Sequence, residues 1–161
     1  MKVNTKSASK REETAQGMVE FALTLPILLM LFFGIIEFGR LLFTYSVVTT
    51  AAREAARYGS AAGDSDYGVP YYKSCDGIRD AAVRIGGMVG VQPGNVTISY
   101  DEGPGSGTLP NCSSSTSVEL GDRVIVQVAA DFQPIVPLVN LNTFTINSIA
   151  KRTILTRVDL N

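Results

Sequence analysis

The sequence contains no histidine and only two cysteines in its 161 residues. Without histidine, the chain lacks the commonest general base and the commonest metal ligand of proteins. The two cysteines, Cys75 and Cys112, cannot supply the four ligands of a structural zinc site, and they form no Cys-x-x-Cys pair. The net charge of −1 gives no field that would attract nucleic acid. We therefore expect a protein that is not an enzyme, with no catalytic residue, metal, cofactor, nucleic acid or small-molecule substrate.

A long apolar run lies near the N-terminus. No formal charge occurs from Phe21 to Ile36, a stretch that spans roughly 24 Å as a helix against a hydrocarbon core of about 30 Å. Glu37 interrupts the run, Arg40 follows one turn later, and Leu41–Val48 is apolar again. Because the two charged side chains can pair while Arg40 extends toward the headgroups, we predict a transmembrane segment at about 21–42. The pair Glu37 and Arg40 would then lie near the outer interface.

The flanking charges predict the orientation of this segment. Its apolar part exceeds the length usual in a signal peptide and no A-x-A site follows, so we interpret it as an anchor. More cations precede it than follow it closely: Lys2, Lys6, Lys10 and Arg11 against Arg53 and Arg57. By the positive-inside rule, residues 1–15 are predicted to be a cytoplasmic basic leader, with the remainder of the chain outside the cytoplasmic (inner) membrane.

The two cysteines fit an outside location, because a disulfide persists only in an oxidising compartment. If Cys75 and Cys112 pair, their separation of 37 residues corresponds to about 3–4 kcal/mol of loop-closure stabilisation. Two unrelated buried thiols are the alternative.

Helical character continues beyond the membrane segment. Small and apolar residues recur at steps of three and four, whereas Arg53, Glu54 and Arg57 lie largely off this stripe; its members are Tyr45, Val48, Ala52, Ala55 and Gly59. Gly63 and the acidic residues after it are expected to end the helix. The sequence thus predicts one helix over 16–62, about 70 Å long, whose second part supports a head.

The remaining residues, 63–161, are predicted to form an extracytoplasmic α+β head. Helical spacing is found in Asp76–Gly90, and alternation typical of strands is found in Asn95–Glu102, Asp122–Phe132 and Thr143–Thr156. Residues Gly103–Ser117 are rich in turn formers and predict a flexible loop. The expected fold class is α+β: a long N-terminal, partly transmembrane helix packed on a small antiparallel β-sheet of three or four strands.

Residues 17–60 resemble the TadE-like pseudopilins of the tight-adherence (Flp) pilus system. The resemblance rests on three motifs in order: V-E-F-A-x-x-L-P from Val19, G-I-x-E-F-G-R from Gly34, and A-A-R-E-A-A-R-Y from Ala51. The combination is more specific than any one motif, and the C-terminal half fits only loosely.

The resemblance implies roles for particular residues. In related prepilins a peptidase cuts on the cytoplasmic side and leaves a glutamate at the fifth mature position. Counting back from Glu20 puts the cut between Ala15 and Gln16, with alanine where the family usually has glycine. The new amine at Gln16 would pair with Glu20 of a neighbouring subunit and fix the register of assembly.

Together these features predict a structural minor pilin or pseudopilin that acts in pilus assembly and surface adhesion. Its expected partners are the membrane, other pilin subunits, the pilus assembly machinery and a prepilin peptidase, and its expected location extends from the inner membrane to a cell-surface pilus. The alternative is a permanently anchored extracytoplasmic binding module that never enters a filament.

Overall fold

In a computed structural model of the chain, the described residues are 6–109, 111–113, 117–135 and 142–155, with the side chains of 6–14 left out. The chain divides into two units. One contains residues 1–40 and 134–141, and the other contains 41–133 and 142–161. Helix α1 (Lys6–Gly59) is continuous from the first unit into the second and includes Pro26.

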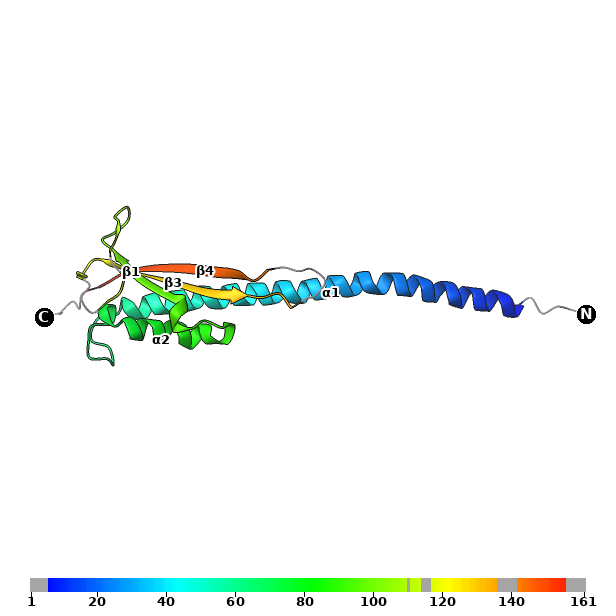
Figure 1. Cartoon of the computed structure of the whole chain (residues 1–161), viewed down its shortest axis with the longest axis horizontal. Coiled ribbons are helices and arrows are strands. Elements are labelled where there is room, and N and C mark those ends of the chain that lie inside the picture. Colours follow the sequence, from blue (N-terminus) through cyan, green and yellow to red (C-terminus); the bar gives the residue numbers. More distant parts are fainter. Residues whose placement is uncertain (1–5, 110, 114–116, 136–141, 156–161) are drawn as a thin grey trace, which may run out of the picture. The chain divides into compact units, whose positions relative to one another are not determined.

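The second unit is a two-layer α+β head, as the sequence predicted. After α1 come the short 3-10 turn η1 (Tyr71–Lys73), helix α2 (Cys75–Gly86) and the 3-10 turns η2 (Gly87–Val89) and η3 (Pro93–Asn95). The strands are β1 (Val96–Asp101), β2 (Thr108–Leu109), β3 (Arg123–Phe132) and β4 (Phe144–Thr153). Figure 1 shows α2 and the C-terminal part of α1 on one side of β3 and β4.

The four strands form one antiparallel sheet in the order β2-β1-β3-β4. Alternation assigns Val96, Ile98 and Tyr100 of β1 to the helix-covered face, and all three are buried. Strand β3 contributes Val124, Val126 and Val128 to the same face. Because one face of this sheet is covered and the other is open, the period of two in the sequence predicted these strands correctly.

Most of the predicted stripe of α1 lies against the sheet and α2, whereas its first member, Tyr45, is 56% exposed. Val48, Ala51, Ala52, Ala55 and Ala56 are all fully buried in the core. A Cβ at Gly59 would lie 2.9 Å from Cδ1 of Ile78 in α2, so glycine permits the helices to approach closely there. Small side chains thus allow α1 to pack directly on the sheet.

Several boundaries differ from the sequence prediction. Helix α1 begins at Lys6, whereas Gln16 was expected, and helix α2 ends at Gly86, whereas Gly90 was expected. Helix α1 ends at Gly59, whereas Ala62 was expected. Ser60 and Ala61 still donate backbone hydrogen bonds into the last turn, and the left-handed glycine at which the chain turns back is Gly63, at φ +105°.

In the predicted loop Gly103–Ser117, the two residues of β2 pair with the end of β1. A two-residue strand carries no periodicity, so no pattern could have revealed it.

Candidate functional site

The first unit is dominated by exposed apolar side chains of α1. The run from Met18 to Phe38 includes large hydrophobic residues that are about half exposed or more, including Phe21, Leu23, Ile27, Leu28 and Ile35. Among the described residues, one helix, Ala15–Gly59, is long and apolar enough to cross a membrane. An apolar surface of this extent cannot stay in water, so it requires either lipid or other helices around it.

Three predicted site residues lie at the start of this surface. Ala15, Gln16 and Glu20 are exposed and belong to regular helix. The backbone carbonyl of Glu20 accepts a hydrogen bond of 2.7 Å from the Thr24 hydroxyl. Within the described part of the chain, no ion pair involves the Glu20 carboxylate.

Glu37 and Arg40 are paired in the structure. Arg40 Nη1 donates to Glu37 Oε1 at 2.8 Å, across one turn of α1. An ion pair of this spacing reduces the cost of placing two charges beside apolar neighbours.

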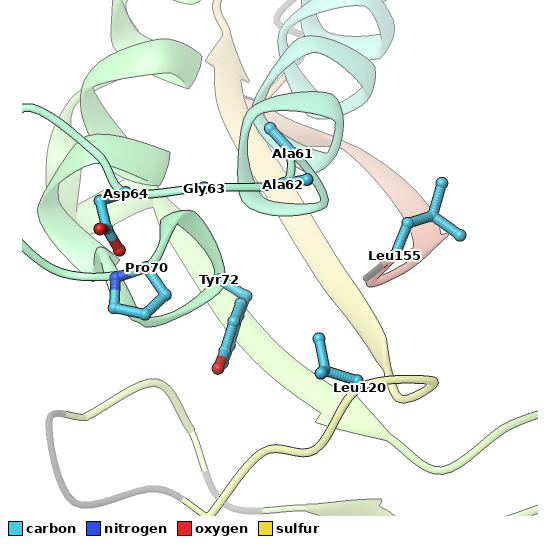
Figure 2. A pocket seen from close by; sticks show the side chains of 8 residues that line it. All are labelled: Ala61, Ala62, Gly63, Asp64, Pro70, Tyr72, Leu120 and Leu155. Atoms are coloured by element: carbon cyan, nitrogen blue, oxygen red, sulfur yellow. The ribbon is translucent and has the colours of Figure 1, made fainter. Parts of the chain in front are cut away.

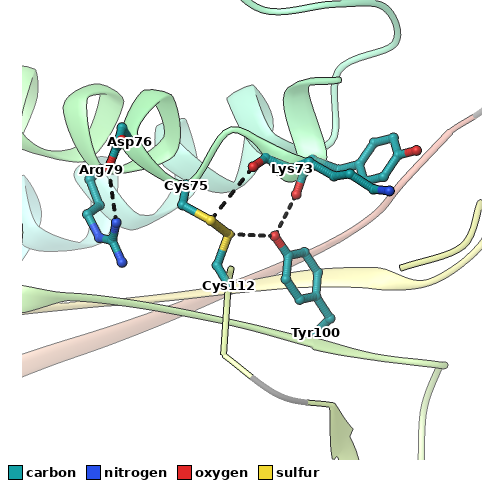
Figure 3. The surroundings of a disulfide bond; sticks show 7 residues. Lys73, Cys75, Asp76, Arg79, Tyr100 and Cys112 are labelled. Carbon is teal, nitrogen blue, oxygen red and sulfur yellow. Dashed lines mark hydrogen bonds and ion pairs between the residues drawn. A yellow bond between two sulfur atoms is a disulfide. The ribbon is translucent and has the colours of Figure 1, made fainter. Parts of the chain in front are cut away.

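The head contains a disulfide between Cys75 and Cys112. Cys75 is the first residue of α2, Cys112 lies in the loop after β2, and their Cα atoms are 5.9 Å apart. Figure 3 shows the bond connecting the helix layer to the loop beside Tyr100. The cross-link therefore holds the segment that follows β2 against the N-terminus of α2.

Tyr100 packs directly on this disulfide. Its hydroxyl donates to the backbone carbonyl of Tyr72 at 2.5 Å and lies 3.0 Å from Cys112 Sγ (Figure 3). The side chain is 1% exposed, and this burial raises the pKa of Tyr100 to about 12. The hydroxyl thus stays neutral and serves as a fixed donor between η1 and the sheet.

A charged cluster lies on the face of the sheet away from the helices, and its carboxylate, Asp101, is buried. Asp101 accepts two hydrogen bonds from Arg123, at 2.5 Å from Nε and 2.6 Å from Nη2. Lys151 Nζ lies 3.4 Å from the same carboxylate. The Arg123 guanidinium holds the pKa of Asp101 below its usual value. Asp101 and Arg123 are direct register partners on β1 and β3, so the bidentate geometry follows from the strand pairing.

Glu54 connects the two helices of the head. Its carboxylate accepts two hydrogen bonds of 2.9 Å from Arg57 on α1 and lies 3.7 Å from Arg84 on α2. Among the described residues, no cluster of three or more histidine, cysteine, aspartate or glutamate side chains could hold a metal ion.

A shallow groove opens at the end of the head where α1 finishes. Its lining is mostly apolar and comes from the α1–η1 connection and the ends of the sheet; Figure 2 shows Ala61, Ala62, Gly63, Asp64, Pro70, Tyr72, Leu120 and Leu155 around it. No sequence pattern predicts this groove, because its residues come from three distant stretches of the chain that only the tertiary structure brings together.

These features define a class: a chain whose described residues include one apolar helix of membrane-spanning length and a small α+β head that contains a disulfide. Residues 15–57 match the family model of the TadE-like proteins, so the resemblance found in the sequence is confirmed for this region. The match is a likeness of this stretch of the chain to that family. It covers about a quarter of the sequence and lies wholly within α1, so it does not extend to the sheet of the head. No curated protein and no solved structure matches the chain significantly.

Proposed function

We propose that this chain is a minor pilin or pseudopilin of the tight-adherence pilus, which is inserted in the inner membrane and then assembled into, or at the end of, a surface filament. The observation that carries the proposal is the TadE-like match on a helix with two surfaces. The described side chains before Arg40 are largely exposed and apolar, whereas Val48, Ala52 and Ala55 are fully buried in the head. Such a helix suits a subunit whose first half packs among the helices of its neighbours.

Processing is part of this proposal. A cut between Ala15 and Gln16 removes the basic leader and gives a new amine four residues before Glu20. A carboxylate in an apolar environment costs on the order of 2.5–3.5 kcal/mol, and a neighbouring subunit's amine at Gln16 would offset that cost only in one register. Glu20 would thereby set the axial position of each subunit.

The orientation is also proposed: leader inside, head outside. It is supported by the excess of cations before the apolar run and by the Cys75–Cys112 disulfide, which is stable in an oxidising compartment. Treating whole cells with a thiol-specific mass tag tests it. We expect both cysteines to be protected until a reductant is added; free thiols in untreated cells would contradict a head outside the cytoplasm.

The decisive experiment is mass spectrometry of the chain in two fractions, the membrane and fibres sheared from the cell surface. The proposal predicts the chain in both fractions, with a mature N-terminus at Gln16 in the fibres. If the chain stays entirely in the membrane fraction, the anchored binding module is the better account. If fibres contain the chain with Met1 intact, processing is removed from the proposal while the filament role remains.

A further inference from the structure

The groove at the end of the head has the size and lining of a receptor for one side chain. Its volume is about 320 Å³, at the lower end of the range of roughly 300–1,000 Å³ that small-molecule pockets occupy. Leu120 and Leu155 flank it and are each more than half exposed, with Pro70 and Tyr72 on its other side (Figure 2). Apolar residues that face water around a concavity indicate a place where an apolar group docks.

A matching projection lies on the same head. Met88 is 71% exposed, more than any other large apolar residue in the described part of the second unit. The turn that carries it is held in place on both sides. Val91 N–H donates to the Gly86 carbonyl, and Gly90, at φ +86°, donates to the Gly87 carbonyl, each at 3.1 Å. Met88 is therefore presented on a fixed turn.

The groove and the projection lie toward opposite ends of the head. Helix α2 starts three residues after Tyr72, which lines the groove, and its twelve residues rise about 18 Å before the turn of Met88 begins. Figure 1 shows α2 running from the end where α1 finishes to the far end of the head. When an apolar projection and its receptor occupy different surfaces of one subunit, the contact between copies is heterologous, and it repeats as an open chain wherever the rotation between copies does not close a ring.

The charges beside the two features are complementary. Arg84, one turn before Met88, has a side chain that is 70% exposed and holds Glu54 only loosely, at 3.7 Å. Asp64, at the groove, is exposed and takes part in no ion pair within the residues that the structure describes. A guanidinium that arrives with the methionine would thus meet a carboxylate at the rim.

We propose that Met88 of one copy of this chain inserts into the groove of a second copy, with Arg84 beside Asp64. The contact rests on the proposed filament role, because it is small and gains its strength when anchored helices keep the copies at high local concentration. Apolar insertion supplies the affinity, and the charge pair selects the orientation.

Site-specific photo-crosslinking of the full-length chain, in membranes and in sheared fibres, tests this contact. With a photoreactive residue in place of Leu120, we expect a dimer whose cross-link maps by mass spectrometry to 84–90 of the other copy. Met88→Ser should reduce this product about tenfold, since truncating a central apolar anchor usually costs more than 1.4 kcal/mol, a factor of ten. Met88→Leu should keep most of it. The matched control is the photoreactive residue at Ile149, which is similarly exposed but lies on the open sheet face.

Charge reversal provides a second measurement. Asp64→Arg and Arg84→Asp should each lower the yield of dimer, and the two changes together should restore it. Cross-links to an unrelated protein, or to residues 156–161 of the same chain, would overturn the proposal, as would a yield equal to that of the Ile149 control. The sheared fraction tests the proposed function separately: a chain that cross-links in membranes but is absent from fibres retains this contact and loses the filament role.

Discussion

Asp101 is the only charged residue among the buried residues of the described chain, and its side chain is 3% exposed. Such a carboxylate is tolerated because Arg123 binds it through two hydrogen bonds and Lys151 lies nearby. If the partner cations or the negative charge were removed, a buried polar group would be left without its partners, which is the costly case.

The lowered pKa of Asp101 predicts how the stability of the head depends on pH. In the unfolded chain the carboxyl titrates near 3.9, and in the folded chain it titrates lower because Arg123 stabilises the anion. The stabilisation is therefore fully present above about pH 4 and is lost as the pH falls through the folded pKa. Asp101→Asn should lower the free energy of unfolding at neutral pH by about 1–3 kcal/mol. It should also make that free energy less dependent on pH in the acid range. Near-UV circular dichroism of the tyrosines in detergent-solubilised chain measures both.

The control for this prediction is Asp131→Asn. Asp131 is an exposed aspartate at the end of β3 and accepts a hydrogen bond of 2.7 Å from the Thr145 hydroxyl. We expect the free energy of unfolding of this variant to fall with decreasing pH as it does in the wild type. An Asp101→Asn curve that stays parallel to the wild-type curve down to pH 3 would show that the ion cluster does not control acid unfolding.

Two consecutive glycines should respond oppositely to the same change. A Cβ on Gly86 would lie 2.7 Å from Cβ of Val91, too close for the backbone to stay in place, whereas a Cβ on Gly87 meets nothing within 4 Å. Gly87 also has helical backbone angles, φ −58° and ψ −32°. Gly86→Ala should therefore destabilise the head by about 1–3 kcal/mol, and Gly87→Ala should be neutral or stabilise it by up to about 1 kcal/mol. Thermal unfolding of the two variants tests this prediction. Equal melting temperatures would contradict the packing argument.

At the scale of elements, the disulfide joins α2 to the segment after β2. Its 37-residue separation corresponds to about 4 kcal/mol of loop-closure entropy in the unfolded chain. Cys112→Ser should therefore lower the melting temperature of the head by many degrees, and Cys75→Ser should give the same loss. The double variant should be no worse than either single one, because one bond is lost in all three. A wild-type melting curve that does not change on adding reductant would refute the assignment of this stabilisation.

The elements were predictable where their periodicity was unbroken. Val124, Val126 and Val128 alternate with more exposed residues, and the stripe from Val48 to Gly59 repeats at helical steps, so burial of one face followed from the sequence. The pairing of Asp101 with Arg123 was not predictable, because it depends on the register of β1 against β3, which no local pattern states.

The candidate site was predictable to a similar extent. The motifs from Val19 to Tyr58 identified the TadE-like region, since they lie within one helix and keep a fixed spacing. The groove was not predictable, because Ala62, Tyr72 and Leu155 come together only through tertiary folding. Met88 was assigned to the helical periodicity of 76–90, but the chain enters a 3-10 turn at Gly87 and exposes its side chain.

At the scale of the whole molecule, the proposed filament makes Glu20 the most sensitive position. Glu20→Ala removes the carboxylate that would pair with the amine of a neighbour, while the apolar run that drives membrane insertion is kept. We expect an unchanged amount of chain in the membrane fraction and at least a tenfold loss from sheared fibres, because one unpaired charge in an apolar environment costs more than 1.4 kcal/mol. Glu20→Asp should restore part of the incorporation. The matched control is Glu13→Ala, a carboxylate in the leader that processing would remove, which should leave the fibres unaffected. If Glu20→Ala enters fibres at the wild-type level, the register of this subunit is set by packing of the apolar helix alone.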